Sequence, residues 1–256
     1  MKNPLGISVG LKNYPLLPEY AAAGFEVVEI SMPDLPLDAL RDFGFAALKL
    51  LKDSGMTLWT VHLPFGRELD ISEPDETKRL AAVDSLGKVI DLARELGAQA
   101  LVVHGSSEPN PDAERAVRMA ACAESLKALQ AKAGSMKLAV ENLPRTCIGR
   151  TGVEIAELSG SCAGVCFDVN HLLIESHEVF MKNAAPHVIT THLSDYDGID
   201  ERHWLPGMGV VPWKQVHDTL LSVGYEGPFL FELGCDKDGE PYKPSLVVNE
   251  WKRVIA

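Results

Sequence analysis

The chain has 256 residues, close to the roughly 250 that an eight-stranded α/β barrel needs, so one domain is the default expectation. With 46% hydrophobic and 23% charged residues, the composition excludes a disordered chain and allows a large buried core. The formal net charge of −12 excludes a general attraction to nucleic acid or to anionic lipid, so we expect neither partner.

Short apolar runs alternate along the chain with longer segments of helical period, which predicts parallel strands joined by helices. The predicted strands are Leu5–Val9, Phe25–Ile30, Thr57–Leu63, Ala98–His104, Met136–Glu141, Gly164–Asp168, Val188–His192 and Pro228–Glu232. The predicted helices are Leu16–Ala23, Leu37–Asp53, Pro74–Leu96, Ala113–Ala133, Val153–Leu158, Ile174–Asn183, Trp213–Val223 and Pro244–Val254. Glycines with an expected positive φ follow five of these helices, at Gly24, Gly55, Gly97, Gly134 and Gly224. This order predicts the α/β class and a single (β/α)₈ TIM barrel that spans residues 1–256 as one domain.

Neither the beginning of the chain nor its apolar runs predict export or membrane insertion. The sequence MKNPLGISVG lacks the apolar core of a signal peptide, and the apolar runs are shorter than the ~18 residues of a membrane span. The five cysteines form an odd number without a Cys-x-x-Cys pair, and we interpret them as reduced, buried small hydrophobes. We therefore expect a cytoplasmic protein.

Ionisable residues lie at or beside the carboxyl ends of seven consecutive predicted strands: Glu29, His62, His104, Glu141, Asp168, His192 and Glu232. In a parallel barrel these ends open on one face, so the side chains are expected to converge there. A ring of unpaired carboxylates would suffer like-charge repulsion, which a divalent cation reverses. The last four residues combine three carboxylates with one imidazole, a set that suits Mn²⁺, Zn²⁺, Co²⁺ or Fe²⁺. The sequence therefore predicts a divalent metal site at the barrel mouth.

Any one of these residues alone would more often cap a loop or form a structural hydrogen bond, so the prediction depends on the whole series. His177, His187 and His217 fall in helices or at the start of a strand, and we interpret them as structural. Trp59, inside the third strand, is expected to pack against the helix layer. The segment 193–212 is rich in Asp and Gly and too long for an ordinary connection, which makes it a candidate functional loop.

Six motifs resemble, in this order, the xylose isomerase-like barrel superfamily of sugar isomerases and epimerases, which also contains the apurinic-site endonucleases. They are VHLPFGRELDIS, LGAQALVVHGSS, LAVENLPRT, GVCFDVNHLL, ITTHLSDYDGIDERHWLPGMG and FLFEL, and they cover nearly the whole chain. In the sugar epimerases one metal is held by residues that match Glu141, Asp168, His192 and Glu232. The resemblance also implies that Glu141 and Glu232 are the catalytic acid/base pair. One glutamate would remove the proton next to a ketose carbonyl, and the other would return a proton from the opposite face.

The endonuclease branch of this superfamily implies a larger set of ligands, which would hold up to three metals for phosphodiester hydrolysis. Its additional ligands match five positions of this sequence: His62, His104, His171, His203, and Glu201 where those enzymes carry an Asp. In a one-metal enzyme the same side chains would contact the substrate instead. The pair Arg202–His203 is also similar to that of hydroxypyruvate isomerases, so it does not decide the class. We expect one tight metal site and leave the role of these five residues open.

The resemblance and the residues together predict a divalent-metal-dependent isomerase or epimerase of a small sugar, sugar phosphate or related ketone, acting through an enediolate. Arg67, Arg145 and Arg150 are candidates for contacts with an anionic substrate, although each could equally pair with surface acids. The alternatives are a multinuclear metallohydrolase of phosphate esters, an inosose-type dehydratase, and a barrel that only binds its ligand. The acidic balance and the lack of basic loops argue against DNA as a substrate. A homo-oligomer is possible.

Overall fold

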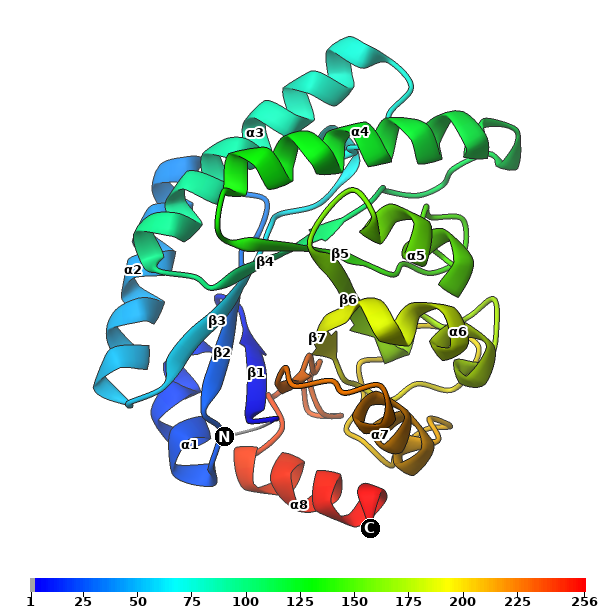
Figure 1. Ribbon diagram of the computed structural model, residues 1–256. Helices are drawn as coiled ribbons and strands as arrows, with labels where there is room; N and C mark the ends of the chain where they lie inside the picture. The colour runs from blue at the N-terminus through cyan, green and yellow to red at the C-terminus, as the bar shows by residue number, and fades with distance from the viewer. Residues whose placement is uncertain (1–2) are drawn as a thin grey trace.

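The computed structural model describes residues 3–256, and in this range eight strands alternate with eight α-helices. The strands are β1 (Leu5–Val9), β2 (Val27–Ser31), β3 (Thr57–His62), β4 (Ala100–His104), β5 (Lys137–Glu141), β6 (Gly164–Asp168), β7 (Val188–His192) and β8 (Phe229–Phe231). The helices are α1 (Leu17–Ala23), α2 (Leu37–Asp53), α3 (Glu76–Leu96), α4 (Arg115–Ala133), α5 (Gly152–Ser159), α6 (His177–Ala184), α7 (Trp213–Ser222) and α8 (Pro244–Ile255). Figure 1 shows the helices as a ring around the strands, in which α1 and α8 are neighbours.

The strands form one parallel sheet in the order β7-β6-β5-β4-β3-β2-β1-β8. Leu193, just after β7, closes the ring against β8. Its N–H donates to the carbonyl oxygen of Leu230 at 2.8 Å, and it accepts from the N–H of Glu232 at 3.3 Å. The predicted α/β class and single (β/α)₈ TIM barrel are therefore confirmed.

The ends of the helices follow from local chemistry that is readable in the sequence. All five glycines expected to follow helices have a positive φ, as predicted: Gly24, Gly55, Gly97, Gly134 and Gly224. Asp75 begins α3, because its carboxylate accepts hydrogen bonds from the N–H groups of Thr77 and Lys78. The sixth helix begins at His177, three residues later than predicted, because the Ser176 hydroxyl accepts from the N–H of Val179.

The core is divided between two layers. A large apolar cluster fills the space between the strands and the helices, whereas a small one, formed by Val102, Ala139 and Cys166, lies apart from it. Cys122 and Cys147 are also buried, Cys162 is half-buried and Cys235 is exposed. The expectation that every cysteine is a buried hydrophobe is therefore wrong at Cys235 and only partly met at Cys162.

Trp59 does not occupy the place expected for it. The register between β2 and β3 shifts between Val28 and Glu29, so that Val28 pairs with Leu58 and Glu29 with Thr60. This bulge leaves Trp59 without a partner on β2, and its Nε1 donates to the Thr190 hydroxyl of β7 at 3.2 Å. The indole therefore reaches across the barrel, and the prediction that it packs against the helix layer is wrong.

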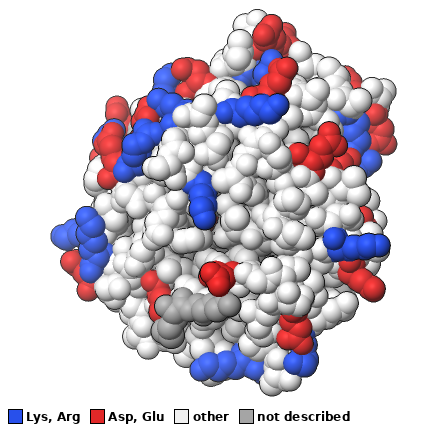
Figure 2. Space-filling view, viewed as in Figure 1, with Lys and Arg blue, Asp and Glu red and all other residues white. Residues whose placement is uncertain are grey.

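No helix in the range 3–256 is long and apolar enough to cross a membrane. On the face shown in Figure 2, positive and negative side chains are interspersed and gather mainly around the rim. Outside the grey atoms, this face therefore offers no broad positive surface of the kind that binds a phosphate backbone.

His177, interpreted as structural, is the first residue of α6, and its ring lies beside that of Tyr196 with centroids 6.2 Å apart. Its Nε2 is buried and finds no hydrogen-bond partner among the residues that the structure describes. Burial lowers the pKa of His177 to about 4, although the negative charge of Asp195 acts to raise it. The positive end of the helix dipole disfavours the imidazolium in the same direction.

A half-buried, neutral His177 predicts a loss of stability in mild acid. In the unfolded chain the imidazole of His177 takes up a proton near pH 6.5, whereas in the folded chain it does so only near pH 4. The contribution of neutral His177 to the free energy of unfolding is therefore complete above pH 6.5 and is lost as the pH falls from 6.5 to 4. Between pH 7 and pH 5 the free energy of unfolding should fall by roughly 2 kcal/mol more in wild type than in His177→Gln. Urea denaturation at both pH values measures this, with the exposed His187→Gln as control. Equal losses in wild type and His177→Gln would contradict the prediction.

Candidate metal centre

Four side chains at the carboxyl ends of the last four strands meet at the barrel mouth. Each of Glu141, Asp168, His192 and Glu232 offers one donor atom, and all four atoms lie within 4.8 Å of one another. His192 Nδ1 is 3.1 Å from Glu141 Oε1 and 3.2 Å from Glu232 Oε2. The structure thus brings together the four residues expected to hold a metal.

Glu141 stands at the centre of a group of histidines. Its Oε2 faces His62 Nε2 at 3.0 Å and His104 Nε2 at 3.2 Å, while its Oε1 faces His192 and, at 3.5 Å, His171. Burial would raise the pKa of Glu141, but the surrounding imidazoles, above all His192 and His104, hold it well below its ordinary value. Burial also opposes a charge on His62, yet its hydrogen bond to Glu141 raises its pKa to about 9. Glu141 is therefore anionic, whereas burial lowers the pKa of its neighbour His104.

Asp168 is the carboxylate that most clearly needs a cation. It is fully buried, and its Oδ2 has no hydrogen-bond partner in the described range 3–256. Burial, together with the charges of Glu141 and Glu232, raises the pKa of Asp168 well above its ordinary value. A divalent ion among these side chains would supply the missing partner and remove the repulsion. The donor set and the free Oδ2 therefore fit a metal.

The additional candidates form a second group around the first. His171, Glu201 and His203 offer donor atoms within 4.8 Å of one another, and His171 Nδ1 is 3.4 Å from Asp168 Oδ2. Arg145 already occupies one side of this group, because its Nη2 is 2.6 Å from Glu201 Oε1. The structure also brings His62, Glu141 and His192 within 4.8 Å of one another. The candidate ligands from the sequence and Arg145 therefore lie at one mouth.

Two of the three arginines proposed as anion contacts have acidic partners. Arg145 pairs with Glu108, Asp200 and Glu201, at 2.6 to 2.8 Å. Its pKa is correspondingly raised, first of all by the hydrogen bond to Glu108. Arg150 reaches the carboxylate of Asp112 at 3.2 Å. The charge of Arg145 is therefore compensated within the protein.

Two hollows lie beside the candidate metal ligands. One, of about 220 Å³, is lined by Phe65, His104, Arg145, His171 and Glu201 among others, and the Phe65 ring stacks on His104 with centroids 4.1 Å apart. The other, of about 210 Å³, is bordered by Glu232 and includes Lys12, Ser8 and Ser31.

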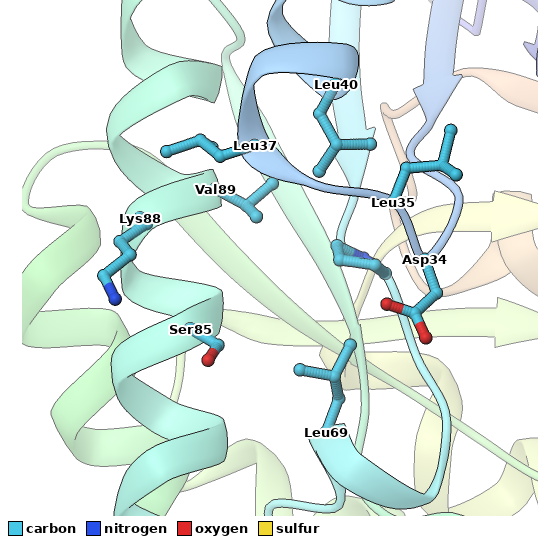
Figure 3. A pocket seen from close by; sticks show the side chains of 9 residues that line it. Asp34, Leu35, Leu37, Leu40, Leu69, Ser85, Lys88 and Val89 are labelled. Atoms are coloured by element: carbon cyan, nitrogen blue, oxygen red, sulfur yellow. The ribbon is translucent and has the colours of Figure 1, made fainter.

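A third hollow, of about 250 Å³, contains none of the candidate ligands. As Figure 3 shows, Leu35, Leu37, Leu40, Leu69 and Val89 surround it with three polar side chains, Asp34, Ser85 and Lys88. Only two of these side chains are ionisable, so it lacks the convergent ionisable groups of the mouth.

The long segment 193–212 is tied down by one side chain that the sequence interpretation did not single out. Asp195 is fully buried, and its carboxylate accepts hydrogen bonds from the N–H groups of Tyr196, Gly207 and Val211 and from Trp213 Nε1. This arrangement fixes the loop that carries Glu201 and His203. The signal was present in the sequence, because Asp195 lies in the motif that begins ITTHLSD.

Two asparagines were also missed, although both lie inside the quoted motifs. The Asn142 side chain exchanges two hydrogen bonds of 2.8 Å with the backbone of Asp168. The backbone carbonyl oxygen of Asn142 is 2.8 Å from His171 Nδ1. Asn170 Oδ1 accepts from the N–H of Arg202 at 3.0 Å. These amides join the ends of β5 and β6 to the long loop, and so position the ligand side chains.

The comparisons with known proteins agree with this geometry. Residues 17–249 match the family model described as "Xylose isomerase-like TIM barrel". An L-ribulose-5-phosphate 3-epimerase from Escherichia coli is 22% identical over 242 residues, which covers 89% of this chain and 84% of that protein. Its counterpart from Salmonella typhi is 21% identical, with the same coverage.

Solved structures share the fold over the full chain. A D-tagatose 3-epimerase-like protein has a TM-score of 0.79 at 19% identity, covering 100% of this chain and 98% of its own. D-psicose 3-epimerase from Clostridium cellulolyticum, solved with D-tagatose, has a TM-score of 0.79 at 18% identity, covering 100% and 99%. The resemblance inferred from the motifs is confirmed, and the relatives named here include sugar epimerases. The chain belongs to the xylose isomerase-like TIM barrel family.

Proposed function

We propose that this protein is a divalent-metal-dependent epimerase or isomerase of a small ketose. The observation that carries the proposal is the convergence of Glu141, Asp168, His192 and Glu232 to within 4.8 Å at the barrel mouth. The sugar epimerases among its relatives support the same reaction class. When bound, the metal would polarise the ketose carbonyl and the neighbouring hydroxyl.

Glu141 and Glu232 are suited to the two proton transfers. They follow β5 and β8, which are separated by β6 and β7 in the closed ring, so they approach a sugar at the mouth from different sides. Glu141 is almost fully buried, whereas the Glu232 side chain is 26% exposed and borders a hollow. One carboxylate would remove the proton next to the carbonyl, and the other would return a proton to the opposite face.

The hollow beside Glu141 would hold the rest of the sugar. Phe65 provides an apolar wall against His104, while His171 and Glu201 offer polar contacts. Arg145 lines the same hollow, but its three acidic partners compensate its charge, which disfavours a phosphate there. The relatives' names include both a ketose phosphate and free ketoses. We infer that a ketose without phosphate is the better substrate.

A multinuclear metallohydrolase is the second candidate. It is favoured by the donor atoms of His171, Glu201 and His203, which also lie within 4.8 Å of one another. Against it, the guanidinium of Arg145 lies 2.6 Å from Glu201, where it competes with a cation. An inosose-type dehydratase would share the first proton transfer and the same single metal.

Deuterium incorporation tests the proposed reaction. The metal-loaded protein is incubated in D₂O with ketopentoses, ketohexoses and their phosphates, and NMR monitors the carbon next to the carbonyl. At least one free ketose should incorporate deuterium at this position and convert to its epimer or isomer. Absence of exchange with the whole panel, together with hydrolysis of phosphate esters, would contradict the proposal.

A further inference from the structure

Glu29 is a buried carboxylate to which the proposed reaction gives no role. It is the third residue of β2 and is 0% exposed. The Ser8 hydroxyl of β1 donates to its Oε1 at 2.9 Å, and the Thr60 hydroxyl of β3 donates to its Oε2 at 2.8 Å. Both donors are neutral, and a buried carboxylate is costly without a stronger partner.

That partner is a histidine on the other side of the barrel. His192 Nε2 is 3.0 Å from Glu29 Oε1 and 3.1 Å from Oε2. Among residues 3–256, no Lys or Arg side chain forms an ion pair with Glu29 in the structure. The imidazole of His192 is itself 0% exposed, so this contact is shielded from water.

The two ring nitrogens of His192 face different groups. Nδ1 points to Glu141 and Glu232 at 3.1 and 3.2 Å, in the proposed metal site, while Nε2 points away from it to Glu29. A neutral imidazole has one nitrogen with a free lone pair, and it binds a metal through that nitrogen. The N–H on its other nitrogen commonly donates to a carboxylate. Such a carboxylate fixes the tautomer and the orientation of the ring.

We propose that Glu29 is a positioning residue that keeps the proton of His192 on Nε2 and so presents Nδ1 to the metal. The inference rests on the metal site of the proposed function. It also explains why an acid lies on β2, a strand that supplies none of the four ligands. Ser8 and Thr60 hold the Glu29 carboxylate, which in turn holds His192, so β1, β2 and β3 together orient a ligand on β7.

Metal affinity of the apoprotein is the first test, measured by calorimetric titration with Mn²⁺ and Co²⁺. Glu29→Gln keeps the size of the side chain but removes the anionic acceptor, so binding should weaken by about 10- to 100-fold. Thr60→Val removes one donor to Glu29 and should weaken binding by a smaller factor. Glu19→Gln, on α1, removes the same charge far from the mouth and should leave the affinity unchanged.

The tautomer itself is read by ¹⁵N NMR on the Zn²⁺-loaded protein, with the His192 signals identified by their loss in His192→Asn. The wild type should carry the proton on Nε2, and Glu29→Gln should lose this preference. Wild-type affinity in both Glu29→Gln and Thr60→Val, or a proton on Nδ1 in wild type, would overturn the inference. Tight metal binding that depends on Glu29, in a protein that exchanges no ketose proton, would leave the inference standing and contradict only the proposed reaction.

Discussion

Glu141→Gln and Glu232→Gln should each abolish deuterium exchange into the ketose substrate. The carboxamide keeps the shape of each side chain but cannot accept the proton, and a general acid or base contributes about 10²- to 10⁴-fold. The effect should be large at both positions, because in the proposed reaction Glu141 and Glu232 act on opposite faces of the substrate. NMR in D₂O with the best substrate of the panel measures the loss.

Both glutamates are also proposed ligands, so the metal content of each variant has to be measured beside its activity. A variant that keeps its metal but loses exchange supports the acid/base role directly. Glu68→Gln serves as control, because Glu68 is an exposed residue in the loop after β3. Full exchange in both metal-loaded variants would refute the assigned roles.

The architecture was predictable because each strand and helix has its own local signal. The eight predicted strands differ from the observed ones by at most two residues at either end, and the glycines after five helices mark where each helix ends. The mouth was predictable for a geometric reason. Parallel strands place their carboxyl ends on one face, so residues as distant as Glu141 and Glu232 could be brought together without knowledge of any contact.

Features that depend on register and on pairing between side chains were not predictable. The bulge in β3 moves Trp59 across the barrel, and no pattern in the sequence indicates where a strand gains an unpaired residue. The ion pairs of Arg145, which was a candidate for binding an anion, were not predictable either. Its pairing with Glu108 and Glu201 arises from loops that meet only in the folded chain.

For Glu29, the sequence indicated a functional position but not the contact that the side chain makes. Its place in the series of ionisable residues was visible in the sequence, and this suggested a function. Its depth within the barrel was not visible, because it follows from the register of β2 against β1 and β3. Instead of joining the ligands at the mouth, its carboxylate contacts His192.

The number of metal ions separates the epimerase from the hydrolase, and we expect one tightly bound ion in the wild type. Asp168→Ala should empty this site, because Asp168 Oδ2 is a buried carboxylate oxygen with no hydrogen-bond partner among residues 3–256. His62→Ala and His203→Ala should each keep about one equivalent, since neither residue belongs to the set of four. Elemental analysis of the purified proteins measures the count, and Asp218→Ala, an exposed acid on α7, is the control.

We expect one ion instead of three because of the charges of the second group. Glu201 is its only carboxylate apart from those of the main site, and Arg145 already lies 2.6 Å from it. An added divalent ion would have to displace this guanidinium or accept its repulsion. Replacing Arg145 with Gln should therefore raise the affinity of the second group for Zn²⁺ without changing the main site. Three stoichiometric ions in the wild type, with one lost in His203→Ala, would instead favour the hydrolase.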